Sequence, residues 1–247
     1  PAAAPPAVAQ APGEGRRVAL VIGNAGYRNV PMLRNPPADA DLLAATLRAS
    51  GFASVTVKTD LTREGMIQSL QDFATVADSA DWAMIYFSGH GVEIGGSNYI
   101  IPVDARLRAD RDAELETISA TQLLGAIEGA RKLRLVVLDA CRDNPFASQM
   151  RRVSGTRSVG RGLARIEPDV GTLVVYAAKH GETALDGDGA NSPFASAMAR
   201  RIGQTPPVEL RRLFDLVRDD VLAATGRKQQ PFSYGSIPGS EDFYFAH

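Results

Sequence analysis

The sequence predicts an α/β fold, in which a mostly parallel β-sheet carries helices on both faces. Two observations support this class. Short apolar runs rich in β-branched residues, typical of buried strands, alternate at least four times with segments whose apolar residues recur at helical spacing. The chain has 247 residues, of which 45% are apolar, and this size suits a single domain or at most two.

The expected strands are short, and most of them end at glycine-rich or polar residues. The first, at residues 18–22, stops at the Gly-Asn-Ala-Gly sequence 23–26, and the third, at 82–87, stops at Ser-Gly-His-Gly, residues 88–91. The pattern predicts further strands at 52–59, 133–138 and 172–177, a hairpin that pairs 91–94 with 99–103, and a last strand at 242–245.

Helices are expected between these strands. The first, at residues 36–50, has Pro36 at its start and Gly51 just past its end, the usual asymmetry of helix termini. The second, at 62–77, places its large apolar side chains on one face. The same periodicity predicts helices at 121–130, 193–202 and 208–224.

Two segments depart from this alternation. Residues 1–15 consist of Ala, Pro, Gly, Val, Gln and Glu, and we expect them to form a flexible lead-in to a domain at 16–247. Residues 7–11 also resemble the small-residue end of a secretory signal, so a cytoplasmic location and a periplasmic or secreted one both remain open. The segment 142–170 is aperiodic and rich in arginine, and a loop of this length is usually functional or disordered.

Charge and composition argue against several classes of function. The 27 basic and 28 acidic residues give a net charge of −1, so the basic field of a nucleic-acid-binding protein is missing. The apolar runs fall short of the roughly 18 residues that a membrane span needs. Cys141 is the only cysteine, which excludes an intrachain disulfide, and with three histidines it makes a metal site a poor expectation. No cofactor is predicted.

His90 and Cys141 follow the ends of two expected parallel strands. Ligands bind beyond the carboxyl ends of such strands, so we expect both residues on the same rim of the sheet. A neighbouring imidazole can activate a thiol as a nucleophile and protonate a leaving amine. Two structural interpretations stay open at this point: a cysteine buried as a small hydrophobe, and a histidine that only hydrogen-bonds within its loop.

The residues around this pair resemble the two signatures of the caspase-like cysteine proteases. The matching segments are Tyr-Phe-Ser-Gly-His-Gly at 86–91 and Leu-Asp-Ala-Cys-Arg at 138–142. In that family the histidine lies about 50 residues before the cysteine, and here the separation is 51 residues. The first strand, 18–24, resembles the opening of metacaspases, paracaspases and their bacterial relatives. The resemblance runs from about Arg17 to Phe245.

The resemblance implies a cysteine endopeptidase with a Cys–His dyad. Cys141 would attack the scissile carbonyl and His90 would protonate the leaving amine. The backbone N–H groups of Gly91 and Cys141 would form the oxyanion hole. The alternative function is a catalytically inert caspase-like interaction or signalling module. The chain keeps both Cys141 and His90, which favours an enzyme.

Three acidic residues carry the specificity that the resemblance implies. Asp139 lies two residues before the cysteine, where metacaspases and paracaspases, which cut after basic residues, have Asp and true caspases have Gln. Asp39 and Asp186 match two further acidic pocket positions of paracaspases. The implied partners are peptides or proteins with a basic P1 residue, and Arg is preferred over Lys because its planar fork pairs better with carboxylates.

Local interpretations of two of these acids remain open. Asp39 could cap the helix that begins near it. Asp186 belongs to the turn Asp-Gly-Asp-Gly at 186–189, where Asp is common for local reasons. This turn lacks the rest of an EF-hand loop, so the sequence does not indicate calcium dependence.

Two further expectations concern processing and assembly. An arginine-specific protease could cut its own loop, and the candidate sites are Arg152, Arg157, Arg161 and Arg165. A merely solvated basic loop is the alternative. We expect the protein to be a monomer.

Overall fold

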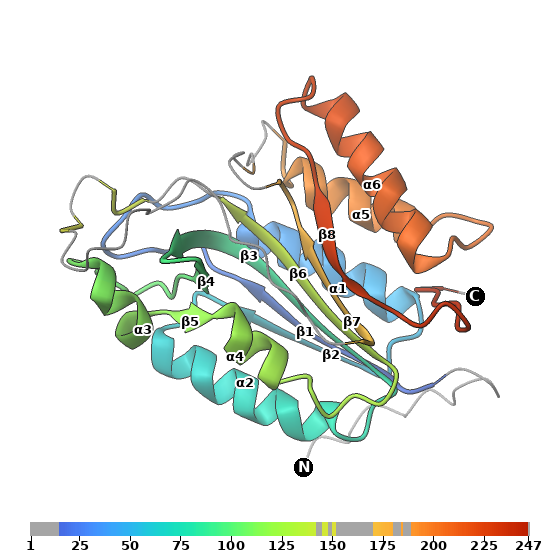
Figure 1. Cartoon of the computed structure of the whole chain (residues 1–247). Helices are drawn as coiled ribbons and strands as arrows, with labels where there is room; N and C mark the ends of the chain where they lie inside the picture. The colour runs from blue at the N-terminus through green and yellow to red at the C-terminus, as the bar shows by residue number, and fades with distance from the viewer. Residues whose placement is uncertain are drawn as a thin grey trace, which may run out of the picture.

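The centre of the fold is an eight-stranded β-sheet (Figure 1). The computed structural model describes residues 15–141, 145–147, 150–151, 170–179, 184 and 189–246. Six strands lie in the order β2-β1-β3-β6-β7-β8, and all neighbours are parallel except the edge strand β8. Their bounds are Arg17–Gly23 (β1), Ser54–Thr59 (β2), Trp82–Ile94 (β3), Leu133–Cys141 (β6), Thr172–Tyr176 (β7) and Phe232–Ser236 (β8). The predicted α/β class is confirmed.

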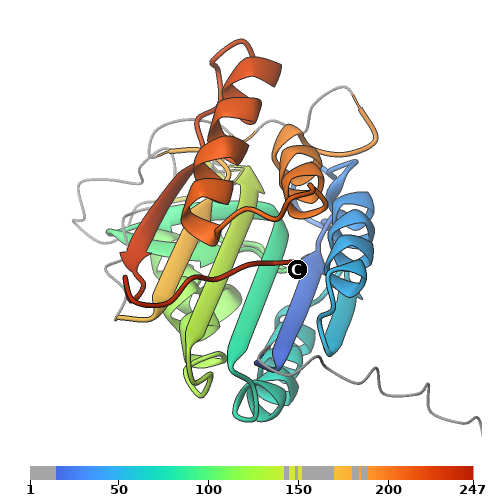
Figure 2. The same cartoon turned by 90° about the vertical axis from the view of Figure 1, so that its right-hand side faces the viewer.

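Helices cover both faces of this sheet (Figure 2). One face carries α1 (Pro36–Ala49), α5 (Pro193–Ile202) and α6 (Leu210–Ala224), and the other carries α2 (Arg63–Ala77) and α4 (Ala120–Gly125). Alternate residues of each central strand enter the two cores. In β1, Ala19 and Val21 pack with α1, whereas Leu20 and Ile22 pack with α2. Burial on both faces explains why these strands are continuous apolar runs in the sequence.

The first helix begins close to the carboxyl end of β1. Pro36 suits the first turn because its fixed φ is helical and its missing N–H has no partner to lose there. A Cβ on Gly23 would collide with the backbone of Pro36, so glycine permits this close approach. The approach brings Asp39, in the first turn of α1, to the carboxyl end of the parallel strands.

β3 is longer than its apolar run indicates. The run predicts a strand that stops at Phe87, yet β3 extends to Ile94 and has 13 residues in all. It pairs with β6 as far as His90 and then forms an antiparallel hairpin with β4 (Ser97–Ile100), which pairs with β5 (Ile118–Ser119). Likewise β6 continues past Leu138 to Cys141. His90 and Cys141 therefore lie within the last paired residues of two strands, and their predicted position beyond the strand ends is wrong.

The last strand lies elsewhere than predicted. Residues 242–245 do not form a strand: Phe243 and Phe245 are buried against Trp82, and the backbone makes an isolated bridge between Glu209 and Tyr244. Packing of the two rings, not strand pairing, produces the alternation seen in the sequence. The actual edge strand is β8, whose residues are exposed or half-buried and give no apolar pattern.

The segment after the hairpin contains short elements that the sequence does not predict. These are the 3₁₀ helix η1 (Asp110–Asp112) and α3 (Ala113–Glu116), each too short to show an apolar period. The helix predicted at 121–130 is also shorter, since α4 ends at Gly125. Within the described ranges, no helix has both the length and the apolar character to cross a membrane.

Candidate active site

His90 lies at the carboxyl end of the parallel part of β3, with 6% of its surface exposed. Its backbone N–H donates to Tyr27 Oη (2.7 Å), and its ring packs on that of Tyr27 with centroids 4.5 Å apart. Its Nε2 lies 3.0 Å from the carbonyl oxygen of Pro31. A carbonyl oxygen only accepts, so this hydrogen bond puts the proton of the neutral imidazole on Nε2 and leaves Nδ1 as the basic nitrogen.

Gly89 permits the contact between Tyr27 and His90. A Cβ at residue 89 would lie 2.6 Å from Tyr27 Oη and 3.2 Å from the carbonyl oxygen of Asn24. The first distance is well below van der Waals contact, so a larger residue would displace Tyr27 from the His90 N–H. Close packing thus requires the glycine that precedes the histidine.

Cys141 is the last residue of β6, and the parallel register pairs it with His90. Neighbouring strands lie about 4.8 Å apart, so the backbones of the two residues are adjacent. The rim that the sequence predicts for them is therefore present. The side chain of Cys141 lies outside the described part of the chain.

Gly91 presents its N–H away from β4. The Ile101 N–H donates to the His90 carbonyl oxygen (3.0 Å), and Gly91 is paired with Ile100. In an antiparallel ladder these facts make Gly91 and Ile100 a non-hydrogen-bonded pair, so the Gly91 N–H points toward the opposite edge of β3. β6 runs along that edge up to Cys141.

Two buried carboxylates lie beside this rim and are joined by one serine. Asp39 is 1% exposed and Asp139 is 5% exposed. The Ser192 N–H donates to Asp39 Oδ1 (2.9 Å), and the Ser192 hydroxyl donates to Asp139 Oδ2 (2.5 Å). Asn191 Nδ2 also donates to Asp39 Oδ1 (3.0 Å). Residues from α1, β6 and the start of α5 thus form one polar cluster.

Two residues of β3 complete this cluster from the sheet. Tyr86 is fully buried, and its hydroxyl donates to Asp139 Oδ2 (3.1 Å). Ser88, paired with Asp139 in the register, donates to Asp39 Oδ2 (3.3 Å). Burial, together with the nearby charges of Asp139 and Asp39, raises the pKa of Tyr86 well above its usual value of 10.0, so its hydroxyl remains a donor at neutral pH.

The cluster decides one open interpretation of the sequence. Asp39 does not cap α1, because the N-cap position is Asn35 and the Asp39 side chain contacts Ser88 and Ser192 instead. A buried carboxylate needs several hydrogen bonds to offset its desolvation, and those of Asp39 come from Ser88, Asn191 and Ser192, not from the backbone of its own helix.

Two members of this cluster show no sign in the sequence that they contact the buried carboxylates. Tyr86 belongs to an apolar run and is typical of core. Ser192 precedes Pro193 and is recognisable only as an N-cap, a role that it also performs by accepting from the Ala195 N–H (2.9 Å). Other predicted residues lie outside the described part of the chain, namely Asp186, Arg152, Arg157, Arg161 and Arg165.

The sheet order and this rim define a caspase-like α/β domain. The caspase domain family matches residues 16–239, and the chain belongs to that family. Human mucosa-associated lymphoid tissue lymphoma translocation protein 1 is 37% identical over 89 residues, which are 36% of this chain and 11% of that protein. Cell death protein 3 of Caenorhabditis remanei is 30% identical over 138 residues, which are 53% of this chain and 25% of that protein. The chain thus aligns with a quarter or less of the length of these relatives.

Proposed function

We propose that this protein is a cysteine endopeptidase that cleaves after basic P1 residues, Arg in preference to Lys. The observation that carries the proposal is the register of β3 and β6, which pairs His90 with Cys141 beside the buried carboxylates Asp39 and Asp139. Membership of the caspase domain family supports the same reaction class.

The proposed reaction uses groups of the chain alone. The thiolate of Cys141 attacks the scissile carbonyl carbon, and the Gly91 N–H, with that of Cys141, stabilises the oxyanion. The C–N bond breaks, and the leaving amine takes a proton from His90. Water then attacks the thioester while His90 accepts a proton, which releases the new carboxyl end and restores the thiol.

The proposed P1 pocket contains Asp39 and Asp139. Two carboxylates held in place by Ser192, Tyr86 and Ser88 present fixed negative charge in a site shielded from water, where an ion pair is strong. A guanidinium has five donors in a planar fork and can bind two carboxylate groups, whereas an ammonium is a point charge. Asp186 is proposed as a third acid of the same pocket.

Cleavage of a peptide library by the wild type beside Cys141→Ala tests the reaction and its specificity together. We expect products that end in Arg or Lys, and we expect none from the variant. His90→Ala should lose at least about 100-fold in rate, as is typical for a missing acid–base group. Wild-type turnover in Cys141→Ala would refute the mechanism. Folded wild-type protein without any turnover would support the alternative, an inert interaction module.

Processing is part of the proposal. Arg152, Arg157, Arg161 and Arg165 are the proposed sites at which the active enzyme cuts its own chain. Incubation of the wild type beside Cys141→Ala, followed by sequencing of new N-termini, tests this directly. An active wild-type chain that stays intact would show that no processing is needed.

A further inference from the structure

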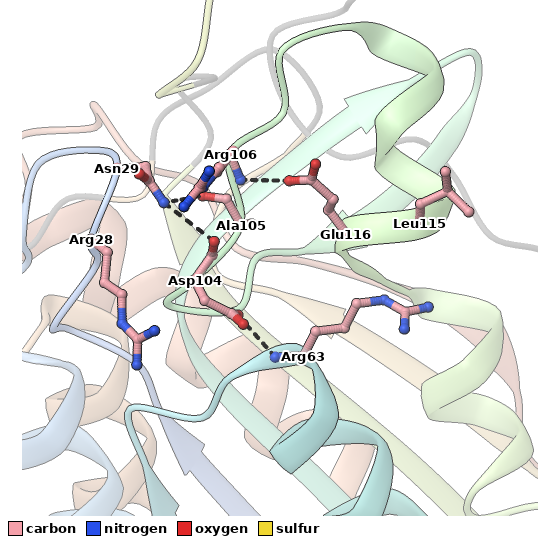
Figure 3. Close-up of a pocket in the computed structure, with 8 residues that line it drawn as sticks. All are labelled: Arg28, Asn29, Arg63, Asp104, Ala105, Arg106, Leu115 and Glu116. Carbon is pink, nitrogen blue, oxygen red and sulfur yellow. Dashed lines mark hydrogen bonds between the residues drawn. The ribbon is translucent and has the colours of Figure 1, made fainter.

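A hollow of about 420 Å³ lies at the start of α2 (Figure 3), and none of its lining residues belongs to the polar cluster of Asp39 and Asp139. It is lined by segments from three parts of the chain: the loop after β1, the first residue of α2, and the stretch from the loop after β4 to α3. The lining residues are Arg28, Asn29, Arg63, Asp104, Ala105, Arg106, Leu115 and Glu116.

The two carboxylates in this hollow hold the backbone in place. Asp104 Oδ1 accepts from the Arg63 N–H (3.0 Å), at the first residue of α2. Glu116 Oε2 accepts from the N–H groups of Arg106 (2.6 Å) and Leu107 (3.1 Å). In Figure 3 the Asp104 carboxylate is turned toward the Arg63 N–H and the Glu116 carboxylate toward the Arg106 N–H. Their negative charge therefore fixes the walls of the hollow.

The three guanidinium groups are not committed in this way. Among the residues that the structure describes, Arg28, Arg63 and Arg106 form no ion pair. Arg63 Nε is buried, and no described residue accepts a hydrogen bond from it. The positive charge of Arg63 is thus not offset by a described carboxylate, and an anion in the hollow would be attracted to it. The three guanidinium groups of the hollow are thus available to bind an anion.

We propose that this hollow binds acidic segments of peptides, and that it serves the proposed peptidase as a substrate-binding site separate from the P1 pocket. The lining is mixed: three guanidiniums stand against two carboxylates, a modest positive excess that suits separate Asp and Glu side chains better than a dense phosphate chain. Leu115 is 72% exposed at the edge of the hollow and offers an apolar contact to the same segment.

The hollow shares a loop with the candidate active site. The Arg28 N–H donates to the Val103 carbonyl oxygen (2.9 Å), and this hydrogen bond joins the loop after β1 to the loop after β4, two of the segments that line the hollow. Tyr27 and Pro31, on either side of Arg28 in the same loop, contact His90. A segment bound at Arg28 therefore lies on the loop that positions the imidazole.

Direct binding tests this site without any need for cleavage. The probe is the fluorescent peptide Asp-Asp-Leu-Glu-Asp, the receptor is the full chain with Cys141→Ala, and the readout is fluorescence anisotropy. Arg28→Gln, Arg63→Gln and Arg106→Gln should each weaken binding about tenfold or more, as expected for a lost charged hydrogen bond. Arg212→Gln, at an exposed arginine of α6, is the matched control and should bind as the parent does. Melting temperatures identify any variant that fails to fold, and the other two variants then decide.

Three results would overturn the proposal. They are equal binding of the neutral peptide Asn-Asn-Leu-Gln-Asn, binding that none of the three substitutions weakens, and binding of pyrophosphate that is tighter than that of the acidic peptide. A second measurement adds the acidic sequence to a P1-Arg substrate of the active enzyme. We expect a lower KM that the arginine substitutions abolish, with the short substrate unaffected. Because binding is measured in an inactive chain, its outcome is independent of whether the proposed peptidase activity exists.

Discussion

Replacement of Asp139 by Asn removes one charge from the proposed P1 pocket and keeps the shape of the side chain. The Asn side-chain oxygen can still accept from the Tyr86 and Ser192 hydroxyls, which both donate to Asp139 Oδ2 in the structure. Its NH₂ group then stands where the second carboxylate oxygen stood. A P1 guanidinium would meet a donor in place of an acceptor.

The size of the effect follows from burial. Asp139 is 5% exposed, so its interaction with a P1 cation takes place largely out of water. Loss of one partner of a desolvated, hydrogen-bonded charge pair costs about 2–5 kcal/mol. A central value of about 3 kcal/mol lowers kcat/KM for a P1-Arg peptide about 150-fold. Asp39→Asn should cost less, because Asp39 also receives hydrogen bonds from Asn191 and from the Ser192 N–H.

The assay compares matched peptides that differ only at P1, with Arg, Lys, Gln and Asp, for the wild type and Asp139→Asn. The loss should be confined to Arg and Lys, whereas the low rate on Gln should stay unchanged. Asp219→Asn, at a side chain that is 66% exposed, is the control for a general loss of negative charge. Equal losses on Arg and Gln, a preference for Asp, or indifference to P1 charge would refute the acidic pocket.

Three further predictions concern positioning and stability. Ser192→Ala removes the hydroxyl that donates to Asp139 and caps α5, so KM for P1-Arg peptides should rise more than kcat falls. Ser192→Thr keeps a hydroxyl and should restore part of the loss. Unchanged kinetics in the Ala variant would contradict this role. Gly89→Ala should destabilise the fold by about 1–3 kcal/mol and lower kcat, because the added Cβ displaces Tyr27; wild-type values in urea unfolding and in peptide turnover would count against it. Arg201 and Arg200 hold the pKa of Asp220 below its usual 3.8. The ion pairs of Asp220 therefore stabilise the fold above that pH, and this stabilisation is lost as the pH falls through the lowered pKa. Asp220→Asn should therefore lose about 1–2 kcal/mol at pH 7 and little at the lowest pH in urea unfolding, and an equal loss at both would exclude the linkage.

The sequence predicts those strands whose own residues are buried on both faces. β1, β6 and β7 are continuous apolar runs because helices cover both sides of them. The sequence does not predict β8, because this strand is placed by pairing with β7 and its side chains are exposed or half-buried, so they form no apolar pattern. Phe243 and Phe245 lead to a strand being predicted where none forms, because two buried rings separated by one residue give the same alternation as a strand.

Some residues of the candidate site can be predicted from the sequence and others only from the fold. His90 and Cys141 are found from residue type and strand position, since a parallel sheet brings the ends of its strands to one rim. The environment of Asp39 depends on how closely α1 approaches β1, which the sequence does not specify. Ser192 joins two carboxylates from distant parts of the chain, and only the folded structure brings these three residues together. Asp186 and the four arginines of the long loop stay predictions.

The continuity of β3 through two kinds of pairing has a consequence for motion. Residues 83–88 are flanked by β1 and β6, so their amides become accessible only when the whole sheet opens. Residues 91–94 pair with the short strand β4, and we expect this hairpin to open at lower free energy than the central strands. His90 lies at the boundary between these two parts of β3. We therefore expect fraying of the hairpin to loosen the backbone next to His90 before the central sheet opens, while Tyr27 and Pro31 still hold the His90 N–H and ring.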